Sequence, residues 1–403
     1  MRVLIADKLA ESVSPHLETC GCAVTTDGAL KGDALSAALS LHNPQVLVVR
    51  STKVRPEQIL AATSLSLIIR AGAGTNTIDV AFAASRGIYV ANCPGKNAVA
   101  VAELTLGQLI NLDRRLSDNI HDLRAGVWAK KKYGVARGLK GRTLAVLGCG
   151  KIGQEVILRA KAFGMRVRAW SRSLDRARAE ELGVDYAATP IDACRGANAL
   201  TAHLAYTPDT HHIINAELLE ALAPGAYVIN TARGGIVDEQ ALRQAIQTRG
   251  LRAGLDVFEN EPGSGESTFS DAEISDNAGI YGTHHIGAST LQATEEVGDE
   301  VVRIVKNYQR SGTVLNCVNL AHQSAATHLL VVRHADQVGV LAGILDALRA
   351  NEINVQEMEN IIFQGGTAAC ARIQLHGSPS AQTLDAIREN DQIFAVSVMS
   401  IQR

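Results

Sequence analysis

Short aliphatic segments alternate with longer amphipathic segments along most of this chain, and this alternation restricts the fold more than any other feature. The aliphatic segments are Val3–Ala6, Val46–Val49, Leu67–Ile69 and Ile88–Ala91, followed by Thr143–Leu147, Arg166–Trp170, Ala199–Leu204, Tyr227–Asn230 and Gly254–Val257. Strands separated by enough residues for a helix pair in parallel. Nearly continuous apolar strands are typical of sheets that helices cover on both faces. The sequence therefore predicts an α/β fold with two βα domains.

The last part of the chain follows a different order. A stretch rich in polar and small residues, Asn319–Thr327, interrupts the apolar pattern and indicates a linker. Beyond it, the pattern predicts the order β-α-β-β-α-β of a ferredoxin-like domain. The predicted elements are His328–Arg333, Val340–Ala350, Val355–Ile362, Cys370–Leu375, Leu384–Glu389 and Phe394–Val398. A length of 403 residues is sufficient for such a third domain.

Composition excludes several classes of partner. The 41 acidic and 39 basic side chains leave a net charge of −2, so no broad positive field favours nucleic acid or an anionic membrane. Seven cysteines without a CxxC pair are typical of a reducing compartment. No apolar run approaches the ~18 residues of a membrane helix, and Asp7 comes too early for a signal peptide. We therefore expect a cytoplasmic protein that binds neither nucleic acid nor membrane and has no metal site.

A glycine-rich motif follows the first strand of the second βα series. It is the GxGxxG sequence Gly148, Cys149, Gly150, Lys151, Ile152 and Gly153, and it opens a helix expected to end near Phe163. In this context the first glycine permits a tight turn, the second lets a pyrophosphate approach the backbone, and the third lets the helix pack on the strand. The helix N-terminus also favours negative charge. The motif predicts a dinucleotide site.

The cofactor's identity stays open at the end of the next strand. An NAD site usually has an acid about 20 residues beyond the glycines, which binds the ribose hydroxyls. Here the chain reads Trp170, Ser171, Arg172, Ser173. Arg172 can receive the 2′-phosphate of NADP, or it can stack on adenine as an ordinary surface arginine. We expect a nicotinamide cofactor, with NAD slightly favoured and NADP left open by Arg172.

Charged side chains follow three further strands of the second series. Arg233 comes after Tyr227–Asn230, Asp256 and Glu261 follow the next strand, and His285 follows another. Strands of such sheets deliver these groups to one edge, where ligands bind. An arginine fork suits a 2-oxo acid, and a carboxylate beside a histidine raises the pKa of the imidazole, which can then exchange a proton with the substrate oxygen.

These motifs resemble the D-isomer-specific 2-hydroxyacid dehydrogenase family over essentially residues 1–320. The resemblance rests on Arg70–Gly74, Asn97 with Ala102–Leu104, Gly148–Gly153, Thr231–Glu239, Leu255–Pro262 and His285–Thr290. It implies that Arg233 binds substrate, that Glu261 pairs with the catalytic His285, and that Asp256 lies near the nicotinamide and helps to tune His285. It also implies cofactor contacts from His203, Thr231 and Ala232. Ala205 replaces a frequent proline, and the acid expected near Ser171 is missing.

Within that family the chain is most similar to the phosphoglycerate dehydrogenases. The segment from Val49 to Lys53 resembles their substrate loop, in which Arg50 and Ser51 hold the substrate. By the same resemblance, Ala73, Gly74 and Asn97 contact substrate. Lys130, Lys131 and Lys132 stand where the family has a basic group near the phosphate, although such a run is also typical of a solvated surface.

The tail resembles an ACT domain, the amino-acid-sensing module of biosynthetic enzymes. By position, His334, Asp336 and Asn354 are the candidates for holding L-serine as an effector. A tail that only joins subunits is the alternative. The resemblance divides the chain into a substrate-binding domain of residues 1–97 and 289–318, a dinucleotide-binding domain of residues 98–288, a linker of residues 319–326 and a regulatory domain of residues 327–403.

The expected activity is NAD(P)-dependent oxidation of D-3-phosphoglycerate to 3-phosphohydroxypyruvate, a step of serine synthesis, by a homodimer or homotetramer. One alternative is a hydroxypyruvate or glyoxylate reductase or another D-2-hydroxyacid dehydrogenase, which Arg172 favours and the tail does not. A second is a non-catalytic NAD-sensing protein, against which the complete set of Arg233, Glu261 and His285 argues.

Overall fold

The computed structural model describes residues 1–262, 269, 277–321 and 324–401. The chain divides into two compact units, Met1–Asn319 and Leu320–Arg403. The first unit contains a five-stranded and a seven-stranded sheet, and the second contains a four-stranded sheet. The predicted fold class, two βα domains followed by a ferredoxin-like domain, is confirmed.

The first sheet is parallel and has the strand order β2-β1-β3-β4-β5, which is the flavodoxin-like order. Its strands are β1 (Arg2–Ile5), β2 (Ala23–Thr26), β3 (Val46–Val49), β4 (Leu67–Arg70) and β5 (Tyr89–Asn92). Its helices are α1 (Val13–Thr19), α2 (Gly32–His42), α3 (Pro56–Ala61) and α4 (Val80–Ser85). The sequence pattern did not predict β2, because this edge strand is polar and no residue in it is fully buried.

The second sheet is also parallel, with the order β12-β11-β10-β9-β6-β7-β8. Its strands are β6 (Thr143–Leu147), β7 (Arg166–Trp170), β8 (Asp185–Tyr186), β9 (Ala199–Ala202), β10 (Tyr227–Asn230), β11 (Arg252–Leu255) and β12 (Ile280–Gly282). The chain reverses direction across the sheet between β6 and β9, which is the switch point where Rossmann folds bind dinucleotides.

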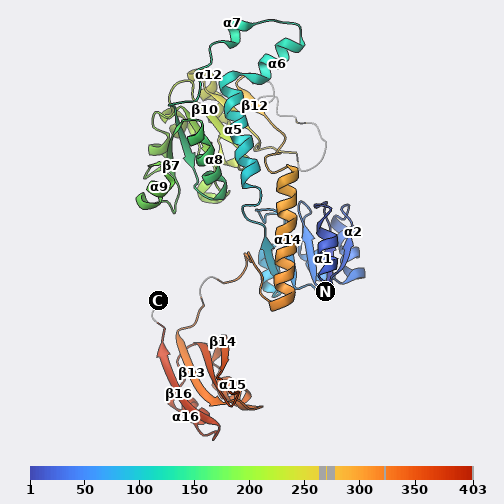
Figure 1. Cartoon of the computed structure of the whole chain (residues 1–403). Coiled ribbons are helices and arrows are strands. Elements are labelled where there is room, and N and C mark those ends of the chain that lie inside the picture. The colour runs from blue at the N-terminus through green and yellow to red at the C-terminus, as the bar shows by residue number, and fades with distance from the viewer. Residues whose placement is uncertain (263–268, 270–276, 322–323, 402–403) are drawn as a thin grey trace. The chain divides into compact units, whose positions relative to one another are not determined.

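Helices cover both faces of the second sheet, as the continuous apolar strands predict. They are α5 (Ala98–Arg114), α8 (Lys151–Ala162), α9 (Arg176–Leu182), α10 (Pro190–Cys194), α11 (Ala216–Ala221) and α12 (Glu239–Arg249), with the 3₁₀ turns η1 (Pro208–Thr210) and η2 (Gly234–Ile236). Two further helices, α6 (Leu116–Arg124) and α7 (Lys130–Tyr133), bury none of their residues. Helix α5 runs beside α8 (Figure 1). Two separate apolar cores result, one on each face of the sheet.

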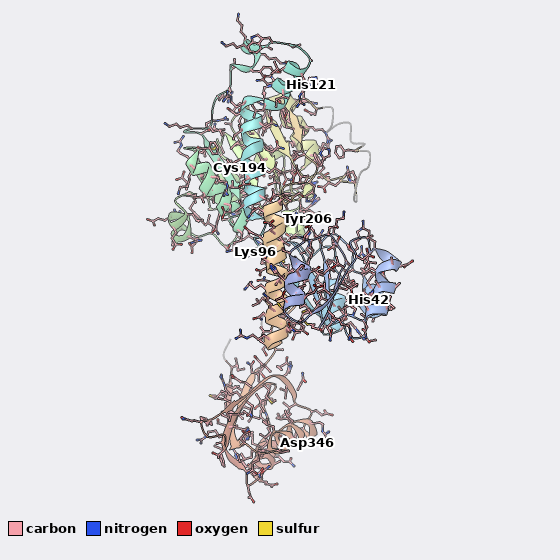
Figure 2. The ribbon with its side chains drawn as sticks, turned by 45° about the vertical axis from the view of Figure 1, so that its right-hand side comes forward. His42, Lys96, His121, Cys194, Tyr206 and Asp346 are labelled. Carbon is pink, nitrogen blue, oxygen red and sulfur yellow. The ribbon has the colours of Figure 1, made fainter. Side chains whose placement is uncertain are left out.

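The long helix α14 (Leu291–Ser311) returns the chain to the first sheet. It packs beside α1 (Figure 1), and its apolar side, which includes Val301 and Ile304, joins the core of that sheet. Lys96, labelled in Figure 2, lies in the connection between β5 and α5, and its Nζ is 3.5 Å from Glu300 Oε2 on α14. The outgoing and returning segments of the chain are thus joined by an ion pair.

The second unit has the predicted β-α-β-β-α-β order. Its elements are β13 (His328–Ala335), α15 (Val340–Ala350), β14 (Asn354–Ile362), β15 (Ala368–His376), α16 (Ala381–Arg388) and β16 (Ile393–Ser400). The sheet is antiparallel with the order β14-β15-β13-β16. Its alternating strands bury one apolar face against both helices.

None of the helices in the described ranges is both long and apolar enough to cross a membrane. Within the residues that the structure describes, no group of three or more His, Cys, Asp or Glu side chains is arranged to hold a metal ion.

Candidate functional site

The glycine-rich turn lies at the carboxyl end of β6, beside the switch point of the second sheet. Gly148 has φ +99°, and a Cβ there would lie 2.4 Å from the carbonyl oxygen of His203. A Cβ on Gly153 would lie 2.0 Å from the Gly148 carbonyl oxygen, so only glycine lets α8 pack this closely. A Cβ on Gly150 would meet nothing within 4 Å, so this glycine faces open space. Open backbone at the start of a helix fits a dinucleotide pyrophosphate.

The residues that follow β7 do not fully match the binding pattern expected for either NAD or NADP. Arg172 is exposed and makes no ion pair with the described residues, so its guanidinium is available to a ligand. A carboxylate does follow, at Asp175, but it accepts a hydrogen bond from the Arg178 backbone N–H and caps α9. Cys149 and Ser171 are partly buried beside this strand end.

His203 follows β9 across the switch point. Its Nε2 lies 3.0 Å from the Thr201 hydroxyl, and its Nδ1 is buried without a hydrogen-bond partner among the described residues. Burial lowers the pKa of His203 to about 3, so the imidazole is neutral at physiological pH. It therefore provides polar atoms to the switch point without adding charge.

His285 and Glu261, which are 24 positions apart in the sequence, meet at the sheet edge. His285 Nδ1 lies 2.8 Å from Glu261 Oε2. This hydrogen bond raises the pKa of His285 above its usual value, and the charge of Glu261 adds to the effect. Burial alone would raise the Glu261 pKa, but hydrogen bonds from His285 and from the Phe258 N–H outweigh it and leave that pKa lowered. Half of the His285 side chain stays exposed, so the imidazole can reach a substrate.

Asp256 organises the turn that carries His285. Its buried carboxylate accepts hydrogen bonds from the Thr283 hydroxyl at 2.7 Å, the Ile286 N–H at 2.9 Å and the Gly287 N–H at 2.8 Å. These contacts stabilise the turn in which His285 adopts φ +52°, a left-handed conformation that is uncommon for residues other than glycine. Asp256 also helps to raise the His285 pKa through its charge. Its contact with a nicotinamide stays a prediction.

Arg233 lies at the carboxyl end of β10, where it precedes η2. Its Nη1 donates to the Ala232 carbonyl at 2.6 Å, and Ala232 N–H donates to Asn230 Oδ1 at 3.0 Å. The charge of Arg233 acts on His285, whose pKa it lowers slightly against the effect of Glu261. The Thr231 hydroxyl lies 3.0 Å from the Thr105 hydroxyl on α5 and anchors this turn.

The first sheet contributes the loop that contains Arg50 and Ser51. The carboxylate of Asp7 accepts hydrogen bonds from the backbone N–H groups of Arg50, Ser51 and Thr52 at 2.7, 3.1 and 3.0 Å, and from the Ser51 hydroxyl at 2.9 Å. Asp7 therefore shapes the loop through its backbone, and the Arg50 side chain makes no hydrogen bond or ion pair with the residues that the structure describes. The sequence patterns did not point to this role, because Asp7 and the loop are more than 40 residues apart.

Arg70, at the end of β4, also belongs to this group and was not predicted. Its pKa is lowered first by burial and then by the nearby charges of Arg233 and Arg50. Arg70 Nε is buried without a hydrogen-bond partner in the described part of the chain. A Cβ on Gly72 would lie 1.7 Å from Arg70 Nη1, so this glycine makes room for the guanidinium. The sequence could have indicated this role, because Arg70 is the first residue of the Arg70–Gly74 motif.

The remaining predicted substrate residues border the same region. A Cβ on Gly74 would lie 3.1 Å from Arg233 Nη2, and the Ala73 carbonyl accepts from Asn92 at 2.6 Å. Asn97 Oδ1 is buried without a partner among the described residues. Lys132, in contrast, pairs with Asp122 at 2.8 Å in the α6–α7 segment.

The predicted effector residues lie in the second unit. The His334 side chain is buried, with Nδ1 2.7 Å from the Ala335 carbonyl and Nε2 3.2 Å from Asn360 Oδ1. Asp336 is partly buried and Asn354 is exposed. His334 is therefore engaged within the domain, whereas the other two side chains are accessible.

Comparisons with known proteins give a consistent picture. Residues 106–287 match the family described as D-isomer specific 2-hydroxyacid dehydrogenase, NAD binding domain. A D-3-phosphoglycerate dehydrogenase of Methanocaldococcus jannaschii is 36% identical over 324 residues, which are 79% of this chain but only 60% of that relative. A hydroxypyruvate reductase of Thermotoga maritima is 41% identical over 261 residues, which are 64% of this chain and 82% of that relative.

Solved structures of 2-hydroxyacid dehydrogenases also match this chain. A D-lactate dehydrogenase of Aquifex aeolicus, complexed with NAD and lactic acid, matches with a TM-score of 0.67 at 25% identity. The match covers 80% of this chain and 100% of that one.

Proposed function

Because the chain belongs to the D-isomer-specific 2-hydroxyacid dehydrogenase family, we propose that it oxidises D-3-phosphoglycerate at C2, using a bound nicotinamide dinucleotide. The observation that carries this proposal is that the guanidinium groups of Arg70 and Arg233 both lie against the Gly72–Gly74 segment, with Arg50 near enough for its charge to lower the Arg70 pKa. A substrate with both a carboxylate and a phosphate supplies enough negative charge to match three guanidinium groups.

The His285–Glu261 pair supplies the acid–base chemistry of the proposed reaction. Neutral His285 accepts the proton of the C2 hydroxyl through Nε2, since Nδ1 is engaged with Glu261. Glu261 stabilises the imidazolium that forms. A nicotinamide dinucleotide held at the glycine-rich turn of Gly148–Gly153 would supply the hydride acceptor for C2, and the C2 alcohol would then become a ketone. Arg233 holds the C1 carboxylate and polarises the C2 oxygen.

The two other arginines suit the phosphate. Arg50 is held by the loop that Asp7 shapes, and Arg70 has an unpartnered nitrogen. Arginine forks bind phosphate through charge-assisted hydrogen bonds. Glyoxylate and hydroxypyruvate have no phosphate, so they leave two of the three buried or partly buried cations without a counter-charge.

The test is a spectrophotometric assay of the full chain with NAD or NADP. We expect higher kcat/KM for D-3-phosphoglycerate than for D-glycerate, which lacks only the phosphate. The 41% identity to a hydroxypyruvate reductase makes that activity the second candidate. Equal kcat/KM for both hydroxy acids, or faster reduction of hydroxypyruvate than of 3-phosphohydroxypyruvate, contradicts the proposal in favour of the reductase.

Replacing Glu261 by glutamine is expected to move the pH dependence of oxidation to lower pH. The glutamine can still accept a hydrogen bond from His285, but it cannot stabilise the imidazolium by charge, so the raised His285 pKa falls. Oxidation requires neutral His285 and therefore rises with pH through that pKa. The rising limb of a kcat/KM profile should shift to lower pH, with a lower maximum. An unshifted limb would show that another group controls it.

The cofactor proposal rests on the glycine-rich turn and on Arg172. We expect Arg172→Ala to weaken NADP binding by about tenfold or more and to leave NAD binding nearly unchanged, because only NADP presents a dianionic phosphate. Dissociation constants from fluorescence titration measure both effects. Arg178→Ala, a neighbouring exposed arginine on α9, is the control. Equal losses of affinity for NAD and NADP would show that Arg172 only stacks on the adenine and does not bind the 2′-phosphate.

The second unit is proposed to bind L-serine through Asp336 and Asn354. Asp336 can accept from the ammonium group, and Asn354 can both donate and accept. Buried His334 is expected to shape the site rather than to contact the ligand. Serine lowers activity only if it favours one of two conformations.

Millimolar L-serine should therefore inhibit the full chain, and Asp336→Ala should abolish inhibition without changing activity in its absence. Asp346→Ala is the matched control, because Asp346 is an exposed carboxylate on α15 (Figure 2). Serine binding by calorimetry without inhibition would leave a sensor uncoupled from the reaction, and no binding at all would contradict the proposal.

We also propose a homodimer or homotetramer. Support comes from apolar side chains exposed on and after α6, including Leu123 at 58% and Trp128 at 82%. Such a concentration of exposed apolar side chains is typical of a contact surface. Sedimentation equilibrium measures the assembly directly.

A further inference from the structure

A second imidazole–carboxylate pair lies near the sheet edge that carries Arg233 and Glu261. His212 Nε2 hydrogen-bonds Glu259 Oε1. His212 follows η1, and Glu259 lies in the segment after β11, two positions before Glu261. His212 adopts φ +49°, a left-handed conformation that is uncommon for residues other than glycine. Neighbouring contacts must therefore hold this residue where its ring reaches Glu259.

The backbone of His212 is joined to the turn of Arg233. Its N–H donates to the Gly235 carbonyl at 2.8 Å, and the Ile214 N–H donates to the Ile236 carbonyl at 3.1 Å. Gly235 and Ile236 belong to η2, the turn that begins directly after Arg233. The backbone of His212 is therefore tied directly to the turn that follows Arg233.

The segment that contains Phe258 and Glu259 is also held by hydrogen bonds from its backbone N–H groups. The Glu259 N–H donates to Glu239 Oε1 at 2.9 Å, and the Phe258 N–H donates to Glu261 Oε1 at 2.9 Å. A Cβ on Gly234 would lie 2.0 Å from the Phe258 carbonyl oxygen, so the Arg233 turn packs directly on this segment. The His212–Glu259 hydrogen bond closes a ring of contacts that joins η2, next to Arg233, to the Phe258–Glu259 segment, next to Glu261.

Two further aromatic side chains, His211 and Tyr206, lie next to His212 or to its neighbours. The His211 ring stacks on the His212 ring with centroids 3.8 Å apart, and His211 Nδ1 lies 3.2 Å from the Tyr206 hydroxyl. Tyr206, labelled in Figure 2, also covers Gly235, where a Cβ would lie 2.7 Å from Tyr206 Cε2. These contacts restrict the orientation of the His212 imidazole.

We propose that His212 and Glu259 are positioning residues that hold Glu261 and Arg233 in the arrangement required for the dehydrogenase reaction. This inference rests on the function proposed above. Both side chains are about one-third exposed, and ion pairs of that exposure contribute little to stability. The contacts that constrain His212 and Glu259 are better explained by a role in aligning Glu261 and Arg233. A displacement of ~1 Å at a reacting group is enough to lower rates by about 10²-fold.

The test compares His212→Asn, Glu259→Ala and Glu259→Gln in the full chain. Asparagine tolerates a left-handed conformation, but its side chain is too short to replace the imidazole. We expect His212→Asn and Glu259→Ala each to lower kcat roughly tenfold, within the range for a misplaced reacting group, with the KM for the cofactor unchanged. Glu259→Gln, which can still accept from His212, should retain most activity. The double variant should be no slower than either single variant, because both remove one contact.

The second readout is the pKa of His285, followed by NMR of ¹³C-labelled histidine. The charged groups acting on His285 are Glu261 and Asp256, which raise its pKa, and Arg233, which lowers it. Displacing Glu261 should therefore lower the His285 pKa in His212→Asn and Glu259→Ala. Glu220→Gln is the matched control, since it removes an exposed carboxylate that pairs with Arg249 at 3.5 Å in the same domain.

The NMR titration needs no substrate, so it separates this inference from the proposed function. If the wild-type chain does not oxidise D-3-phosphoglycerate but the His285 pKa falls in His212→Asn, the positioning role stands and the substrate assignment fails. An unchanged His285 pKa in both disruptive variants would overturn the positioning role, as would a loss of melting temperature with unchanged kcat.

Discussion

Replacing His285 by asparagine is expected to lower kcat for D-3-phosphoglycerate oxidation by about 10²–10⁴-fold, the range for loss of a positioned acid–base group. Asparagine suits this position because it tolerates the left-handed conformation that His285 adopts at φ +52°. The turn held by Asp256 should therefore stay in place, and the variant loses the proton acceptor without losing the fold. Steady-state kinetics near neutral pH measure the effect.

Cofactor binding provides the control for that variant. The glycine-rich turn lies at β6, whereas His285 follows β12, so the dissociation constant for the cofactor should change less than twofold. A kcat close to that of the wild type would show that His285 is not the proton acceptor of the reaction. A large loss of cofactor affinity would instead show that the substitution disturbs the sheet edge as a whole.

Replacing Arg233 by glutamine is expected to lower kcat/KM by roughly 10²–10³-fold, as the loss of one donor to a developing charge does elsewhere. Glutamine retains a hydrogen-bond donor but not the charge or the planar fork that can hold a carboxylate and polarise the C2 oxygen. The loss should appear in kcat as well as in KM, because the C2 oxygen gains negative charge only as the reaction proceeds in the reductive direction. Rates of 3-phosphohydroxypyruvate reduction measure it directly.

Two further variants separate charge from geometry at this site. Arg233→Lys keeps the charge without the fork and should recover only part of the lost rate. Arg70→Lys should mainly raise the KM for phosphorylated substrates and leave D-glycerate oxidation nearly unchanged, because we assign Arg70 to the phosphate. If Arg70→Lys impaired both substrates equally, this arginine would serve the common part of the substrate or the fold of the Gly72 loop.

Local sequence was sufficient to predict the architecture because its signals are periodic and repeated. The strand Val46–Val49 and the helix Val340–Ala350 have the predicted bounds. The GxGxxG motif could also be recognised from the sequence, since Gly148 and Gly153 occupy positions where the backbone leaves no room for a Cβ. Strand β2 was missed because a half-exposed edge strand lacks the apolar signal on which the prediction depends.

The parts of the site that went unpredicted depend on contacts between distant segments. Asp7 shapes the Arg50 loop from 43 positions away, and His212 reaches Glu259 from 47 positions away. Neither residue belongs to a motif with a recognisable spacing. The effect of the Arg233 charge on the pKa of Arg70 likewise requires that two sheets bring their strand ends together.

By itself, the order of apolar, glycine and polar residues in this chain specified two parallel sheets, a ferredoxin-like tail and a dinucleotide turn, because each of these follows from short-range backbone and burial preferences. Folding in three dimensions settled which side chains face one another. It brought His285 to Glu261, enclosed the Asp256 carboxylate within the His285 turn, and buried His334 where the sequence suggested a ligand contact. Hydrogen bonding and charge act over a few ångströms, so such pairings depend on chain packing rather than on sequence spacing.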